Sequence, residues 1–191
     1  MDILKKLTEE LGVKLWQTEA AVKLIDEGNT IPFISRYRKE ATGSLNDEVL
    51  RNLNERLAYL RGLEDKKTQV IGSIEEQGKL TEELRAQILA AETLVAVDDL
   101  YRPYRPKRRT RATMAKEKGL DGLADIIRLQ LTKKPLEEEA KAYLSEEKGV
   151  LTVEEAIAGA GDILAEAISD EADYRTYIRK ATFDEGQLCS E

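Results

Sequence analysis

The stretch NDEVLRNLNERLAYLRGLEDKKTQVIGSIEEQG, Asn46 to Gly78, has the apolar spacing of a long helix. Leucines recur every three or four residues and would share one face, at Leu50, Leu53, Leu57 and Leu60. The apolar pattern lapses over EDKK and resumes at Val70, Ile71 and Ile74. Ser44 or Asn46 is the candidate N-cap, with acidic residues in the first turn. The sequence therefore predicts one helix of about thirty residues with a solvent-exposed middle.

The next segment, QGKLTEELRAQILAAET, predicts an antiparallel partner for this helix. Gly78 is the candidate turn residue, and Thr81 is the candidate N-cap. The two elements would form a helical hairpin over residues 46–92. A separate packing unit would then group residues 1–45 with 93–191.

The flanking regions also favour helices, and the fold class that we predict is all-α, a multi-helix assembly about 70% helical. Thr110 would cap a short helix that ends near Gly119, and Pro135 would begin another. TLVAV is β-branched enough for a strand, but a lone strand has no partner. GAGDIL, from Gly159, resembles a phosphate loop only weakly, because no strand precedes it and no Gly-Lys-Ser/Thr follows. Its small residues instead predict a close contact between two helices.

Composition excludes several function classes. The chain of 191 residues has no histidine and one cysteine, Cys189. The usual general base, Ser-His and Cys-His nucleophile pairs and most zinc chemistry are therefore missing. Asp98 and Asp99 are adjacent, so their carboxylates would point in different directions. We expect no catalytic residue, metal or cofactor. We also expect a cytoplasmic protein, because no apolar run approaches the roughly 20 residues of a membrane span.

Positive charge gathers in YRPYRPKRRTRAT, Tyr101 to Thr113, although the whole chain carries −7. Residues 102–118 alone carry +7. The cations proposed to contact nucleic acid are Arg102, Arg105, Lys107, Arg108, Arg109 and Arg111. Pro103 and Pro106 favour an extended backbone, which could run beside phosphates. The alternative is an internal clamp, in which these arginines pair with carboxylates. We assign the two tyrosines of the segment to packing.

A second cationic group consists of Arg36, Arg38 and Lys39. Arg36 and Lys39 are three residues apart and would share a helix face. Alone, this group is typical of an ordinary solvated surface. It would support nucleic-acid binding if the fold placed it beside the first group.

Three long phrases carry a resemblance to a known family. IPFISRYRKEATGSLNDEVL begins at Ile31, VDDLYRPYRPKRRTRATMAKEKGLDGLA at Val97 and ISDEADYRTYIRKATFDEG at Ile168. Together they resemble the N-terminal region of the Tex family, the bacterial transcription accessory proteins, and the likeness runs in order over residues 1–191. The resemblance implies a helical region with a helix-turn-helix-like subdomain. It also implies that RNase H-like, helix-hairpin-helix and OB-type RNA-binding domains follow in the family. These are absent here, and FDEGQLCSE shows no helical pattern, so we expect part of a longer protein.

Two functions remain open from the sequence. In the first, the chain is non-catalytic and contributes a sequence-nonspecific surface for RNA or DNA by neutralising phosphates. In the second, it is a scaffold that positions the missing domains or docks on the transcription machinery. Neither function involves a membrane or a small-molecule substrate. An enzyme is the least supported third class.

Overall fold

The structure is a computed structural model that describes residues 2–106, 109–130 and 132–190. Within these ranges the regular elements are all helical, and the one β interaction is an isolated bridge between Ser145 and Val150. The all-α fold class is therefore confirmed. The chain divides into two compact units, Met1–Val97 and Asp98–Glu191.

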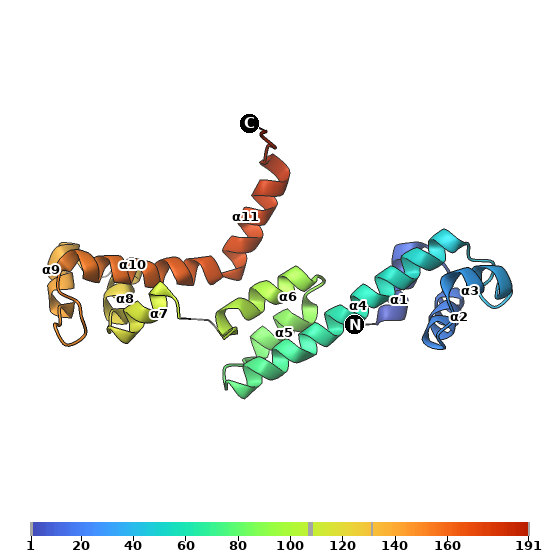
Figure 1. The fold of residues 1–191 in the computed structure, drawn as a ribbon, viewed down its shortest axis with the longest axis horizontal. Helices are drawn as coiled ribbons and strands as arrows, with labels where there is room; N and C mark the ends of the chain where they lie inside the picture. Colours follow the sequence, from blue (N-terminus) through green and yellow to red (C-terminus); the bar gives the residue numbers. More distant parts are fainter. Residues whose placement is uncertain (1, 107–108, 131, 191) are drawn as a thin grey trace. The chain divides into compact units, whose positions relative to one another are not determined.

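The first unit is built around one long helix (Figure 1). Its helices are α1 (Ile3–Leu11), α2 (Leu15–Asp26), α3 (Ile31–Tyr37), α4 (Asp47–Glu76) and α5 (Glu82–Ala90), and α6 (Leu94–Tyr101) begins at its end. Helix α4 has 30 residues, as the leucine spacing predicts. The Asn46 side chain caps it by accepting a hydrogen bond of 2.8 Å from the Val49 amide.

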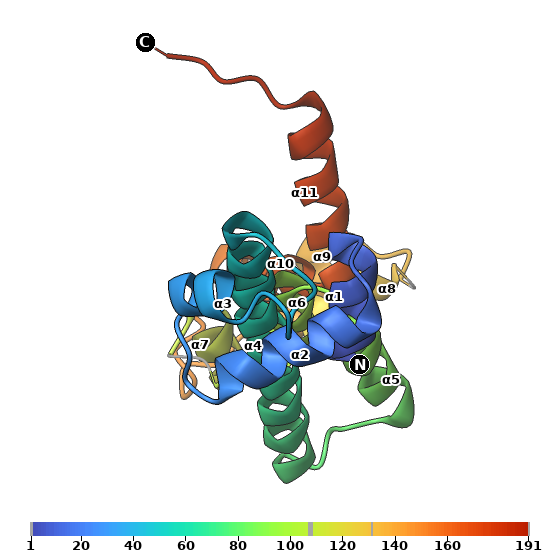
Figure 2. The same cartoon turned by 90° about the vertical axis from the view of Figure 1, so that its right-hand side faces the viewer.

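The first half of α4 forms the core of this unit. The predicted stripe of leucines is buried, namely Leu50, Leu53, Leu57 and Leu60. Helices α1, α2 and α3 surround it (Figure 2), and they contribute Leu7 and Ile34, both fully buried, to the same cluster. At about 1.5–3 kcal/mol for each buried leucine or isoleucine, this stripe is a major source of stability for the unit.

The prediction of a solvent-exposed middle of α4 holds for Asp65 but is wrong for Lys67. Leu63 and Lys67 are both buried there and continue the seam between Leu60 and Val70. The Lys67 amine donates hydrogen bonds of 2.9 Å to a Glu64 carboxylate oxygen and to the Leu89 carbonyl oxygen. A lysine can occupy this position because both partners compensate the desolvation of its charge.

The α4–α5 hairpin has the predicted turn and cap. Gly78 has a positive φ of 66°, and Thr81 Oγ1 accepts from the Leu84 amide at 3.2 Å. The division into units differs from the expected separation of residues 46–92 from residues 1–45 with 93–191. The reason is that α4 shares its buried face with α1, α2 and α3 as well as with α5.

The second unit packs short helices against α10 (Figure 1). Its elements are a 3₁₀ turn (Arg102–Tyr104), α7 (Arg111–Glu117), α8 (Asp121–Leu129), α9 (Leu136–Ala140), a second 3₁₀ turn (Lys141–Tyr143), α10 (Val153–Asp170) and α11 (Ala172–Glu185). Thr110 caps α7 as predicted. Gly159 of α10 faces Leu120 and Ala115, which confirms that small residues permit a close contact between helices.

The last helix, α11, begins where α10 ends and buries none of its residues. It includes Phe183, Asp184 and Glu185, so the interpretation of the final nine residues as non-helical is wrong for these three. The helix-turn-helix-like subdomain implied by the resemblance stays a prediction.

Candidate nucleic-acid interface

Helix α3 carries Arg36, the first residue of the second cationic group. Pro32 lies in its first turn, where its fixed φ suits a helix and its missing N–H costs nothing. Ile34 is fully buried and anchors α3 in the core of the first unit. Phe33, Arg36 and Tyr37 are exposed, so this short helix presents aromatic and basic side chains together.

The loop after α3 is held by a dense set of hydrogen bonds. The buried Thr42 hydroxyl donates to the Arg38 carbonyl at 3.2 Å. The Ser44 amide donates to the Lys39 carbonyl at 2.7 Å. From α2, the Gln17 side-chain amide donates to the carbonyls of Thr42 and Gly43, at 3.1 and 3.2 Å. The backbone that carries the cations is therefore fixed before any ligand arrives.

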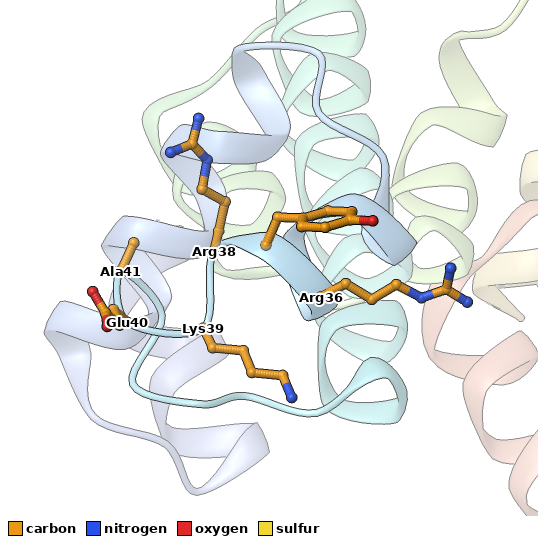
Figure 3. A pocket seen from close by; sticks show the side chains of 6 residues that line it. Arg36, Arg38, Lys39, Glu40 and Ala41 are labelled. Carbon is orange, nitrogen blue, oxygen red and sulfur yellow. The ribbon is translucent and has the colours of Figure 1, made fainter.

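Six consecutive residues, 36–41, line an open pocket of about 360 Å³ (Figure 3). In this view Arg36 and Lys39 extend toward the same side, whereas Arg38 extends away from them. The Arg38 guanidinium lies 5.6 Å from the centre of the Phe33 ring, a cation–π distance. Arg36, Arg38 and Lys39 make no ion pair with any described residue. We name this site the α3 pocket.

The first cationic group, in contrast, does not form an extended strip along its whole length. Residues 102–104 form a 3₁₀ turn, and Arg105 is the first extended residue. The expectation of an extended backbone is therefore wrong for this turn. The φ that proline imposes is compatible with a 3₁₀ helix as well as with an extended chain, so the two prolines do not decide between them.

Three arginines of this group are paired with acids of the second unit. Arg102 contacts Asp170 at 2.9 Å, Arg105 contacts Asp98 at 3.0 Å, and Arg109 contacts Glu117 at 2.9 Å. Their side chains are nevertheless between 42% and 70% exposed. Arg111 is exposed and makes no ion pair within the described ranges, and Lys107 and Arg108 lie outside the described residues. The two cationic groups belong to different units.

A buried clamp that the sequence did not reveal holds α11. Asp99 is almost fully buried and accepts from Arg175 Nε at 2.7 Å and from an Arg179 terminal nitrogen at 2.6 Å. Burial acts to raise the pKa of Asp99, but hydrogen bonds from the two arginines outweigh it and hold this pKa below its usual value. Asp98 instead faces Arg105, so the adjacent carboxylates do point in different directions.

Two aromatic residues at or beside the α3 pocket were not predicted from the sequence as part of a binding site. Phe33 and Tyr37 lie with ring centres 5.4 Å apart, and Tyr37 is 71% exposed. The signal was present in FISRYRK, where aromatic and basic side chains alternate.

Among the described residues, no group of three His, Cys, Asp or Glu side chains is arranged to hold a metal. No helix in the described part of the chain is long and apolar enough to cross a membrane.

Two family models match the chain. The Tex-like protein N-terminal domain matches residues 1–75, and the Tex central region-like model matches residues 131–191. The chain belongs to the Tex family. The α3 pocket and all of α4 except Glu76 lie inside the first match, whereas the arginine-rich segment after α6 lies between the two matched Tex regions.

Relatives support this membership over nearly the whole chain. The transcriptional accessory protein Tex of Neisseria gonorrhoeae is 47% identical over 190 residues, which are 98% of this chain and 24% of that protein. The protein tex of Bordetella pertussis is 46% identical over 98% of this chain and 24% of its own length. The human S1 RNA-binding domain-containing protein 1 is 31% identical over 93% of this chain and 18% of its own length. The chain thus spans about a quarter of the length of its bacterial Tex relatives.

Proposed function

We propose that this chain contributes a sequence-nonspecific nucleic-acid-binding surface to a transcription accessory protein. It would do so by neutralising phosphates and without catalysing a reaction. The observation that carries the proposal is the α3 pocket, where Arg36, Arg38 and Lys39 are exposed and none pairs with an acid among the described residues. The name of the gonococcal relative supports a role in transcription, which in bacteria takes place in the cytoplasm. The name of the human relative supports RNA as a partner.

Because three arginines of the first cationic group are paired with acids, we reverse the order of the two cationic groups in this proposal. An arginine already paired with a carboxylate must break that pair before it gains full contact with a phosphate. Binding a phosphate would break the ion pairs of Arg102, Arg105 and Arg109. Arg36 and Lys39 have no ion pair with a described residue to break. We therefore place the α3 pocket first, and the segment containing Lys107, Arg108 and Arg111 second.

The experiment is a fluorescence titration of labelled RNA and DNA with the 191-residue chain between about 50 and 200 mM salt. Replacement of Arg36, Arg38 and Lys39 by Ala should weaken binding to every sequence alike. The slope of log affinity against log salt should become shallower by about 2 to 3. The matched control replaces Lys5, Lys23 and Lys79, which are exposed lysines of the same unit, and removes the same net charge. Equal losses in both variants, or no binding by the parent chain, would reject the proposal.

A second function, a scaffold or protein-interaction region, is favoured by α11. This helix buries no residue, and it exposes Tyr174, Tyr177 and Ile178 while Asp99 holds it in place. A helix held by two ion pairs, with exposed apolar side chains, suits contact with following domains or with the transcription machinery. Replacement of Arg102, Arg105 and Arg109 by Ala separates the two functions. Loss of helicity in this variant, together with a parent chain that never binds nucleic acid, would favour the scaffold.

A further inference from the structure

We infer that the α3 pocket prefers single-stranded nucleic acid, because Tyr37 provides a stacking surface for an unpaired base beside the phosphate-binding cations. This inference rests on the proposed nucleic-acid-binding function and adds a specificity-determining residue to it. Its basis is the exposure and surroundings of the Tyr37 ring, together with the fixed loop that carries the cations.

The Tyr37 ring is available to a ligand. Tyr37 is 71% exposed, and among the described residues its ring makes one aromatic contact, with Phe33, at an interplanar angle of 43°. Phe33 is less exposed, and the Arg38 guanidinium lies over its ring. Tyr37 rather than Phe33 is therefore the side chain that offers a flat, open face.

Cations flank this ring directly along the chain. Arg36 precedes Tyr37, and Arg38 and Lys39 follow it, so a planar surface and positive charge share one turn of backbone. A nucleotide presents the matching combination, a flat base joined to a charged phosphate. In a duplex the bases stack on one another and cannot reach a side chain at the surface, whereas in a single strand they can.

The fixed loop strengthens this argument. Hydrogen bonds from Gln17 and Thr42 hold the backbone that follows Tyr37, and the buried Ile34 holds α3 beneath it. Binding would therefore cost little backbone entropy. A solvated aromatic side chain with no such support would lose more freedom when it stacks.

Another exposed tyrosine provides a matched control. Tyr177 of α11 is 73% exposed, close to the value for Tyr37. It also has nearby arginines, Arg175 and Arg179, but both of these pair with Asp99. If exposure alone produced stacking, the two tyrosines would contribute equally.

The test measures affinity for single-stranded RNA, single-stranded DNA, a duplex with the same number of phosphates, and an abasic strand that keeps phosphates but has no bases. The parent chain should bind both single strands more tightly than the duplex or the abasic strand. Tyr37→Ala should weaken single-strand binding by about 5- to 100-fold and leave the salt slope unchanged, because no charge is removed. Tyr37→Phe keeps the ring and should retain binding, and Tyr177→Ala should leave it unchanged.

The outcomes separate this inference from the function on which it rests. If the parent chain binds but treats the abasic strand and the single strands alike, the stacking inference is wrong and the phosphate-neutralising function stands. If Tyr37→Ala binds single strands as tightly as the parent chain does, the stacking inference is likewise wrong and the phosphate-neutralising function stands. If the parent chain binds none of the four ligands, both are wrong. Circular dichroism of each variant checks that the helices are intact, and retained binding by Tyr37→Phe shows that binding needs the ring and not the hydroxyl.

Discussion

Lys67 donates a hydrogen bond of 2.9 Å to the backbone carbonyl of Leu89, although the two residues belong to different helices and Lys67 is only 2% exposed. Leu89 lies in the last turn of α5, where carbonyl oxygens have no partner within their own helix. The negative end of the α5 dipole also favours a cation at this position. The lysine therefore joins α4 to α5 while its carbon chain fills the apolar seam.

We expect Lys67→Ala to lower the free energy of unfolding of the first unit by about 2–4 kcal/mol, since it removes both the packing of the stem and the two hydrogen bonds. Lys67→Met keeps a stem of similar length and should cost less than about 2 kcal/mol. Trp16 is the one tryptophan of the chain and lies in this unit, so urea unfolding followed by its fluorescence measures the effect. Equal losses in the two variants would show that the amine, and not the stem, carries the stability.

Replacement of glycine by alanine should have opposite effects on the stability of the second unit at two positions of α10. A Cβ on Gly159 would collide with Leu120 and approach Ala115 to 3.4 Å, whereas a Cβ on Gly161 meets nothing within 4 Å. Gly161→Ala should stabilise the second unit by up to about 1 kcal/mol through helix propensity. Gly159→Ala should destabilise it by about 1 kcal/mol, because crowding in a packed core outweighs that gain. Far-UV circular dichroism during urea unfolding measures both, and the Trp16 transition should not move. A stabilising Gly159→Ala would contradict the close contact.

The buried carboxylate of Asp99 predicts a loss of α11 packing in acid. Its pKa in the folded chain is below the usual 3.8, so the ionised form stabilises the fold at and above about pH 4. This contribution is lost as the pH falls through the lower, folded value. Asp99→Asn should remove it at neutral pH, at a cost of about 1–3 kcal/mol, moderated because both arginines are partly exposed.

Backbone dynamics of α11 from ¹⁵N relaxation at neutral and acid pH measure this effect. Asp125→Asn is the control, since Asp125 and its partner Arg128 are both largely exposed and their pair should contribute less than about 0.5 kcal/mol. If α11 is as rigid in Asp99→Asn as in the parent chain, the clamp does not hold it.

The features that the sequence predicted correctly depend on local spacing. Leucines three and four residues apart and a capping Asn46 specify α4 wherever the rest of the chain lies. The small residues around Gly159 likewise predicted a close contact between helices. Each of these signals lies within about four helical turns, so no knowledge of distant residues was needed.

The errors arose where a residue's partner is distant in the chain. Lys67 resembled a solvated residue because Leu89, which accepts its hydrogen bond, is 22 residues away. Arg102 resembled a free cation, but Asp170 lies 68 residues further along the chain. The Asp99 clamp depends on Arg175, 76 residues away. Charge alone cannot show which cations a fold will pair with acids. The difference between paired and unpaired cations is the reason that we propose the α3 pocket before the arginine-rich segment as the nucleic-acid-binding site.

Gly43 connects the stability of the first unit to the α3 pocket. It has a positive φ of 61°, and a Cβ there would collide with the Trp16 ring and lie 2.7 Å from the Gln17 amide nitrogen. Gly28 is the matched control, since it also has a positive φ, 83°, but a Cβ there meets nothing within 4 Å. Gly28→Ala should cost about 1 kcal/mol from backbone strain alone. Gly43→Ala should cost about 2–3 kcal/mol, because it adds the collision to the same strain.

The two variants should also differ in nucleic-acid binding. Gly43→Ala displaces Gln17, whose amide holds the carbonyls of Thr42 and Gly43, and thereby loosens the loop that carries Arg38 and Lys39. Its affinity for single-stranded RNA should therefore fall, with the salt slope unchanged because every cation remains. Gly28→Ala should bind as the parent chain does. Titration of the folded proteins, with helicity checked by circular dichroism, measures the difference. Equal affinities in the two variants would mean that the fixed loop is not required for binding.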